Sequence, residues 1–342
     1  MTTETPASRA LIVGLSGLRL TPVERAFLRD VRPWGLILFA RNVADPLQVR
    51  DLVADARGEL GWQAPVLIDQ EGGRVQRLRP PHWPEYPPAE RFGQLYRQDP
   101  QQGLAAVRLN SRLMAADLMA LGVDVDCLPV ADLRLPEGHG VIGNRAYGED
   151  PASVAVMAGA AAQGLLDGGV LPVLKHIPGH GRARVDSHEG LPTVETPRAE
   201  LEATDFAAFR PLRGLPLAMT AHVVYADLDP TAPATTSKLV LDEVVRGFIG
   251  FDGALMSDDL SMGALSGTLA ERAKAAIGAG CDLLLHCNGN AEEMEAVAGE
   301  APELEGLAAE RAARALTWRS APPAFDADNA RREVARLLRL AA

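Results

Sequence analysis

Short, continuously apolar segments recur along the whole chain and are separated by amphipathic ones. The apolar segments span residues 10–17, 34–40, 65–72, 123–132, 170–177, 216–224, 253–259 and 281–287. Because they do not alternate with polar residues, they are typical of strands buried on both faces, as in a parallel sheet. Amphipathic segments lie between them, and several begin after proline or aspartate and end at glycine, which is typical of helices. Eight strands alternating with helices predict an α/β fold, a (β/α)8 barrel of the TIM type.

An open doubly wound sheet is the alternative architecture. No Gly-x-Gly-x-x-Gly follows the first predicted strand, which disfavours a dinucleotide-binding version of that sheet. Two amphipathic segments close the chain, at 304–318 and 329–342, and we expect them to be extra helices on the barrel exterior. Since no linker or low-complexity tract divides the chain, we predict one catalytic barrel domain over residues 1–342.

Composition narrows the class of protein. The 342 residues are 47% hydrophobic and carry a net charge of −11, from 34 Lys and Arg against 45 Asp and Glu. An acidic chain is a poor electrostatic match for nucleic acid or an anionic membrane, so we expect neither as a partner. No apolar segment approaches the roughly 20 residues of a membrane span. Three cysteines cannot build a disulfide framework, and the N-terminus has no basic leader, so we expect a cytoplasmic protein.

Polar residues end several of the predicted strands. Asp69 ends the third, Lys175 and His176 the fifth, and Asp258 the seventh. In a barrel, active sites lie at the carboxyl ends of the strands, so we expect these side chains around one site. Only one of Asp258 and Asp259 can face inward, because neighbours on a strand point to opposite faces. An inward carboxylate suits a covalent nucleophile or an electrostatic stabiliser, and helix capping is the alternative.

The segment "KHIPGHGRARVDSHEGLP", residues 175–192, follows the fifth strand and is rich in glycine. Asp186 and His188 lie two residues apart, so in an extended segment they share a face. The carboxylate would then hold the imidazole and favour its protonated form, which makes His188 a candidate general acid and base. A surface histidine beside an unrelated aspartate is the other interpretation.

A metal site is a second possibility for this segment. His176, His180, Asp186 and His188 are ligand types that Zn²⁺ accepts. Proline and glycine at 178–179 remove the helical geometry that would make the spacing of the first two histidines specific. We therefore expect no bound metal, and a metal-dependent barrel hydrolase stays as the alternative.

Seven blocks of the sequence together are similar to one known family. In chain order they are "GLILFARNV", "IDQEGGRVQRLR", "VDCLPVADL", "VIGNRAYGED", "KHIPGHGRARVDSHEGLP", "MTAHVVY" and "MSDDLSM". They resemble the bacterial β-N-acetylhexosaminidases of glycoside hydrolase family 3, which are enzymes of peptidoglycan recycling. The resemblance spans about residues 10–290, and seven blocks in order are far more specific than any one motif.

The resemblance implies a role for individual residues. It implies that Asp258 is the catalytic nucleophile and that His188 is the acid and base, assisted by Asp186. The implied sugar-binding residues are Asp69, Arg77, Arg145, Lys175 and His176. It also implies a monomer that acts on a small saccharide and needs no cofactor.

The implied reaction is retaining hydrolysis of a terminal, non-reducing β-linked N-acetylglucosamine. The expected substrates are muropeptides in which this sugar is joined to anhydro-muramic acid, and the expected intermediate is a glycosyl-aspartate. Phosphorolysis by the same site, a β-glucosidase and a non-catalytic sugar-binding protein are the competing interpretations. The chain departs from the family at Ile177, where phenylalanine is common, and by one residue fewer after Met262.

Overall fold

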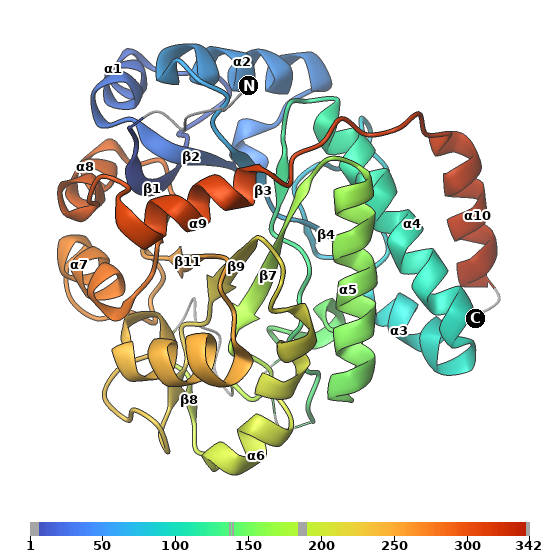
Figure 1. Ribbon diagram of the computed structural model, residues 1–342. Coiled ribbons are helices and arrows are strands. Elements are labelled where there is room, and N and C mark those ends of the chain that lie inside the picture. Colours follow the sequence, from blue (N-terminus) through green and yellow to red (C-terminus); the bar gives the residue numbers. More distant parts are fainter. Residues whose placement is uncertain (1–6, 137, 139, 184–189, 340–342) are drawn as a thin grey trace.

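A closed barrel of eight parallel strands forms the centre of the molecule (Figure 1). The computed structural model describes residues 7–136, 138, 140–183 and 190–339. The barrel strands are β1 (Arg9–Gly14), β2 (Pro33–Leu38), β3 (Val66–Ile68), β6 (Val125–Asp126), β7 (Leu171–Ile177), β9 (Leu217–Thr220), β11 (Ala254–Asp259) and β12 (Leu283–His286). Each strand pairs with its neighbours in the chain, and β12 closes the barrel on β1. The prediction of a (β/α)8 barrel is confirmed.

The strands are shorter than their apolar segments, most markedly the third and the fourth. The third ends at Ile68, and the chain then turns into a separate hairpin of β4 (Gln70–Gly72) and β5 (Val75–Gln76). The fourth, β6, has only two residues. The segment after it still lies alongside β7, because the Lys175 N–H donates to Pro129 O and the Ala131 N–H donates to Lys175 O. Backbone pairing therefore continues toward the site without regular strand geometry.

Helices surround the barrel. They are α1 (Pro22–Val31), α2 (Pro46–Leu60), α3 (Ala89–Gln98), α4 (Pro100–Met119), α5 (Pro151–Asp167), α6 (Arg198–Ala203), η6 (Val240–Ile249, a π-helix), α7 (Leu269–Ala279) and α8 (Ala291–Glu300). Three of them begin with aspartate followed by proline, and Asp45, Asp99 and Asp150 accept hydrogen bonds from the free N–H groups of the first turn. This is the start chemistry expected from the sequence.

Short elements occupy several connections. They are η1 (Ala40–Asn42), η2 (Gly143–Arg145), β8 (Thr193–Val194), η3 (Phe206–Ala208), η4 (Arg210–Leu212), β10 (Val224–Tyr225) and η5 (Ala234–Thr236). The segment 199–212, which lies between the fifth and sixth predicted strands where a helix is expected, forms α6 followed by the 3-10 turns η3 and η4. Pro211 lies in the second turn, and its missing N–H would break a continuous helix there.

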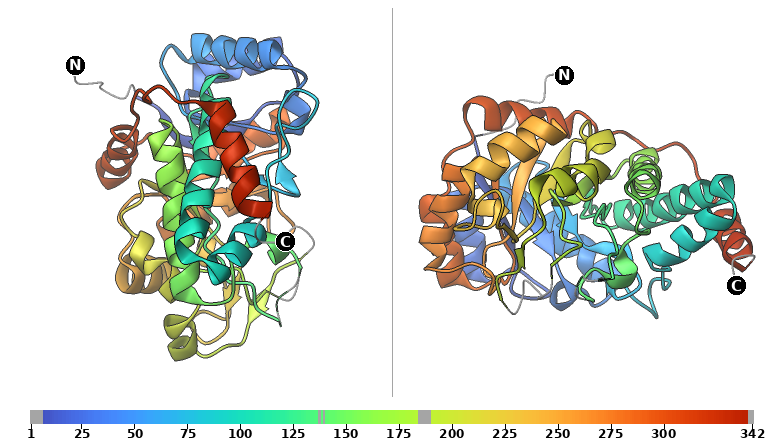
Figure 2. Two further views of the ribbon diagram at one scale, coloured as in Figure 1. Left: turned by 90° about the vertical axis from the view of Figure 1, so that its right-hand side faces the viewer. Right: turned by 90° about the horizontal axis from the view of Figure 1, so that it is seen from below.

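The two helices of the tail pack differently. α10 (Ala327–Arg339) lies against α4 on the outside of the barrel, as expected (Figure 2). α9 (Gly306–Leu316) instead covers the amino-terminal mouth, where Ala312 and Ala315 join the cluster formed by the interior side chains Trp34 and Leu171. The expectation of an exterior position was wrong for α9. Its alanines are small enough for the helix to approach the barrel mouth closely.

Within the ranges that the structure describes, no helix is long and apolar enough to cross a bilayer.

Two helical glycines provide a test of the packing around α3. A Cβ built on Gly93 would lie 1.7 Å from Tyr147 O, two residues after Arg145, whereas a Cβ on Gly58 in α2 would meet nothing within 4 Å. We expect Gly93→Ala to lower the free energy of unfolding by about 1–3 kcal/mol through overpacking. Gly58→Ala should leave it unchanged or raise it by up to about 1 kcal/mol, since alanine favours helix. Urea unfolding followed by circular dichroism measures both, and equal effects would contradict the close contact.

Candidate active site

A pocket of about 330 Å³ lies at the carboxyl ends of the barrel strands. This volume is at the small end of the range for ligand pockets, about 300–1,000 Å³. Its lining includes Phe39, Asp69, Glu71, Arg74, Arg77, Arg145, Lys175, His176, His180, Asp258 and Cys287. Apart from Asp259, the remaining lining is apolar: Ile37, Val75, Val141, Ile142, Met219, Met262 and Leu285. All five sugar-binding candidates and the candidate nucleophile therefore meet at one pocket.

The β4–β5 hairpin brings Arg77 back to Asp69. Gly72 and Gly73 turn the chain with φ of 93° and 58°, a region that favours glycine. The side-chain oxygen of Gln70 accepts from the N–H of Arg77 and holds the returning strand. Arg77 Nη2 then donates to Asp69 Oδ2 over 2.7 Å. The hairpin thus brings Arg77 and Asp69, which are separated in the sequence, into a fixed ion pair at the pocket.

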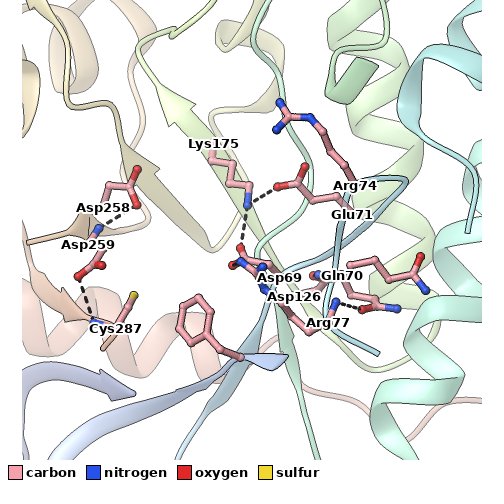
Figure 3. Close-up of polar contacts among 12 residues, drawn as sticks. Asp69, Gln70, Glu71, Arg74, Arg77, Asp126, Lys175, Asp258, Asp259 and Cys287 are labelled. Atoms are coloured by element: carbon pink, nitrogen blue, oxygen red, sulfur yellow. Dashed lines mark hydrogen bonds and ion pairs between the residues drawn. The ribbon is translucent and has the colours of Figure 1, made fainter. Parts of the chain in front are cut away.

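Lys175 lies between two carboxylates on the pocket wall (Figure 3). Its Nζ is 3.0 Å from Asp69 Oδ1 and 2.7 Å from Glu71 Oε1, and only 2% of the side chain is exposed. Burial opposes the charge of Lys175, but the two carboxylates outweigh it and raise the pKa of the ammonium above its usual range. Lys175 is therefore a fixed cation with donors directed at both carboxylates.

Arg145 extends this chain of alternating charges. Its Nε and Nη2 each donate to an oxygen of Glu71 over 2.8 Å, which is a bidentate pair. Burial disfavours ionisation of Glu71, but the charges of Arg145 and Lys175 outweigh it and lower its pKa to about 2. Arg145 Nη2 also lies 3.4 Å from His176 Nε2. The pocket wall is thus one connected, charged network.

A buried carboxylate fixes the ring of His176. His176 Nδ1 lies 2.7 Å from Asp132 Oδ2, so this nitrogen carries the proton and Nε2 faces Arg145. The other oxygen of Asp132 accepts from the His180 N–H over 2.7 Å. Burial disfavours the charge of Asp132, but His176, followed by His180, outweighs it and lowers the pKa. Asp132 thereby holds the first turn of the glycine-rich segment against the barrel.

Asp258 enters the pocket from the end of β11. Its Oδ1 accepts from the N–H of Asp259 over 2.8 Å, and no hydrogen bond from a described residue reaches Oδ2. Burial raises the pKa of Asp258, but electrostatic interactions with His222, His176 and Lys175 and the hydrogen bond from the Asp259 N–H together lower it. The Asp259 carboxylate accepts from the Ser261 hydroxyl and from the N–H of Cys287. Both of its oxygens are therefore engaged, although Asp259 also lines the pocket.

Two predicted residues, Asp186 and His188, lie outside the described residues. The metal alternative used both of them together with His176 and His180. Within the described ranges, no group of three or more histidine, cysteine, aspartate or glutamate side chains is arranged to hold an ion.

A larger depression, of about 620 Å³, lies at the other end of the barrel, between the end of α2 and the α4–β6 connection. Among the residues that the structure describes, its lining contains Arg50, Arg57 and Trp62 but no carboxylate or histidine. Volume alone would favour this depression. The smaller pocket is the better candidate because titratable groups with strongly shifted pKa values converge there.

Several site residues were missed in the sequence. Glu71 follows Asp69 at the i+2 position, and that spacing in "IDQEGG" was an available signal. Asp132 ends the apolar segment "VDCLPVAD", which was another. No local signal marks Thr235, which contacts His222 beside Asp258 from the distant turn η5.

Fold and pocket together define a barrel enzyme that binds a small polar molecule through a charged wall. Residues 12–317 match the model of the glycosyl hydrolase family 3 N-terminal domain. The chain belongs to this family and is a glycoside hydrolase acting on a saccharide.

Similar proteins include one curated sequence and two solved structures. A "Beta-hexosaminidase" of Alkalilimnicola ehrlichii is 43% identical over 302 residues, 86% of this chain and 84% of that protein. The structure of NagZ from Neisseria gonorrhoeae in complex with N-trifluoroacetyl-D-glucosamine is 31% identical, with a TM-score of 0.86 over 98% of this chain and 99% of that one. A family 3 β-N-acetylglucosaminidase from Paenibacillus is 29% identical with a TM-score of 0.84, covering 96% of this chain and 66% of the other.

The buried position of Glu71 predicts a pH-dependent contribution to stability. Its pKa is about 2 in the folded protein against an ordinary value of 4.5, so its stabilisation is present above pH 4.5 and is lost as the pH falls through 2. At pH 7 we expect Glu71→Gln to lower the free energy of unfolding by about 3–5 kcal/mol, since it breaks a buried ion pair. The difference from the unmodified protein should shrink below pH 4.5.

Urea unfolding at several pH values measures this difference. Glu90→Gln is the matched control, because Glu90 pairs with Arg134 at the surface and is 29% exposed. That variant should change stability little at any of these pH values. A Glu71→Gln effect that stays constant from pH 7 to acid would contradict the lowered pKa.

Proposed function

We propose that this protein is a retaining β-N-acetylhexosaminidase that removes a terminal β-linked N-acetylglucosamine through a glycosyl-aspartate intermediate. The observation that carries the proposal is the position of Asp258, an ionised carboxylate facing a charged pocket of monosaccharide size in a family 3 chain. The names of the relatives support the sugar, since a hexosaminidase and a glucosamine complex are among them.

Asp258 is the proposed nucleophile. Its lowered pKa keeps the carboxylate ionised near neutral pH, and Oδ2 is the proposed attacking atom because Oδ1 is held by the Asp259 N–H. Attack of Oδ2 on the anomeric carbon forms an ester bond while the bond to the leaving oxygen breaks. Water later attacks the same carbon and returns the carboxylate, so two inversions give net retention.

His188 is the proposed acid and base, with Asp186 as its partner. In the first step His188 gives a proton to the leaving oxygen, and in the second it takes a proton from the attacking water. The Asp186 carboxylate would favour the imidazolium that the first step needs. Both residues follow in the chain the turn that Asp132 holds through the His180 N–H.

The charged wall is the proposed binding surface for the sugar. Asp69 would accept from sugar hydroxyls, because its pKa is lowered: burial opposes ionisation, and Lys175 and Arg77 outweigh it. Arg145, Lys175 and His176 would contact the hydroxyls and the acetamido group, with Arg145 and Lys175 as donors. Since these groups are already paired with one another, they are oriented before the sugar arrives.

The cellular setting remains part of the proposal. We propose one catalytic domain over residues 1–342, active as a cytoplasmic monomer on muropeptides in which N-acetylglucosamine is joined to anhydro-muramic acid, in peptidoglycan recycling. The acidic net charge of −11 supports a small saccharide over nucleic acid or an anionic membrane as the partner.

The nucleophile assignment has a direct test with 4-nitrophenyl β-N-acetylglucosaminide. We expect Asp258→Asn to lower kcat by about 10⁴-fold, because the shape is retained while the nucleophile is lost. Asp242→Asn, at an exposed surface pair with Lys238, is the control and should retain activity. Activity of the unmodified protein should resist EDTA. Activity abolished by EDTA would instead favour the metal-dependent hydrolase.

The sugar specificity is tested by comparing aryl glycosides. We expect kcat/KM for the N-acetylglucosaminide to exceed that for the β-glucoside by about 10²-fold, because polar groups placed for the acetamido oxygen would remain unpaired with glucose. Comparable values would favour a β-glucosidase, and binding without turnover a sugar-binding protein. The same reaction with added phosphate should still release the free sugar. Formation of sugar 1-phosphate would establish the phosphorolytic alternative.

A further inference from the structure

The strand that carries Asp258 is held by three buried side chains from outside its own segment. Thr220 ends β9, the barrel neighbour of β11, and His222 follows two residues later. Thr235 reaches them from the turn η5. All three side chains belong to residues with 0% exposure, so water does not satisfy their polar atoms. Each hydrogen must therefore be directed at a partner within the protein.

Hydrogen bonds connect these side chains into one path. The Asp258 N–H donates to Thr220 Oγ1 over 3.3 Å, and Thr220 Oγ1 lies 2.8 Å from Thr235 Oγ1. Thr235 Oγ1 lies 2.7 Å from His222 Nδ1, and His222 Nε2 lies 3.0 Å from the carbonyl oxygen of Asp259. The path starts and ends on the backbone of the same dipeptide.

Elementary donor and acceptor accounting fixes the direction of the path. The carbonyl oxygen of Asp259 only accepts, so His222 Nε2 carries a hydrogen. In the neutral ring Nδ1 then accepts from the Thr235 hydroxyl, which leaves the Thr220 hydroxyl to donate to Thr235. Burial lowers the pKa of His222 despite the neighbouring charge of Asp258, in agreement with a neutral ring.

A charged ring is the competing arrangement. Nδ1 would then donate to Thr235, whose hydroxyl could turn to Ala221 O, 3.1 Å away. The two arrangements differ in the number of protons on His222 and can therefore be distinguished by spectroscopy.

We propose that Thr220, Thr235 and His222 are positioning residues that clamp the Asp258–Asp259 backbone through a closed circuit of hydrogen bonds. The N–H of Asp258 and the carbonyl of Asp259 are both held, and the N–H between them holds Asp258 Oδ1. Rotation of the carboxylate away from the pocket would break at least one of these bonds. The inference rests on the proposed function, since it concerns the orientation of the proposed nucleophile.

Removal of one hydroxyl tests the circuit. We expect Thr235→Val to lower kcat on the aryl N-acetylglucosaminide by about 10–100-fold with KM changed less than about threefold, because misorientation impairs attack more than binding. Thr235→Ser keeps the hydroxyl and should restore kcat to within about threefold of the unmodified value. Thr236→Val is the matched control, because its hydroxyl lies in the same turn but, among the described residues, hydrogen-bonds to Pro233 O and not to the circuit.

Two further variants test the circuit at a position other than Thr235. Thr220→Val should reproduce the loss of kcat, and the double variant with Thr235→Val should lose little more than either single one, since both break the same circuit. Thermal unfolding of each variant shows which are folded. The proposal is overturned if a folded Thr235→Val or Thr220→Val retains kcat, if serine does not rescue, or if the Thr236→Val control loses as much.

Nuclear magnetic resonance of ¹⁵N-histidine-labelled protein tests the direction of the path without relying on turnover. We expect the His222 ring, assigned by its absence in His222→Gln, to carry a hydrogen on Nε2 alone. Hydrogens on both nitrogens would overturn the proposed direction. If the unmodified protein fails to hydrolyse the aryl glycoside, the proposed function fails and the catalytic role of the circuit fails with it. If it hydrolyses and only the threonine results disagree, the clamp alone is wrong.

Discussion

The buried ammonium of Lys175 is the constraint on which the site depends. A cation with 2% of its side chain exposed is tolerable only if carboxylates surround it, and Asp69 and Glu71 do so from the end of β3 and from the β4–β5 hairpin. Arg77 and Arg145 then neutralise those carboxylates in turn. A shift of β7, the hairpin or the turn η2 would leave a charge unpaired, so these elements have one acceptable arrangement.

Much of the fold was predictable because the barrel strands are buried on both faces. Their apolar segments are therefore continuous and stand out from the amphipathic helices, and all eight were found. The ends of the strands were less predictable where the chain stays buried after the strand has ended, because hydropathy does not change there. The third segment is apolar through Ile68 and then continues into the hairpin at Gln70, which is buried as well. The packing position of α9 was not predictable, because an apolar face on a helix does not specify which surface of the barrel that helix covers.

The candidate site was predictable to the extent that strand ends determine it. Lys175, His176 and Asp258 end long apolar segments and were located from that position alone. Arg77 and Arg145 were reached only through the resemblance, since their positions depend on how a hairpin and a short turn fold back. Thr235 could not be found, because its role depends on a contact with His222, 13 residues earlier in the chain, that no local pattern encodes. Asp186 and His188 remain predictions.

The position of α9 over the amino-terminal mouth of the barrel determines how substrate enters the pocket and how product leaves it. The floor beneath Met219 and Leu285 continues into a packed layer that includes Trp34, and Ala312 and Ala315 of α9 cover that layer. A molecule that enters from the carboxyl side meets a blind end, so it must leave through the entrance that it used. A released sugar therefore leaves on the same side of the barrel on which the next substrate enters, so within the described part of the chain departure and entry share one opening.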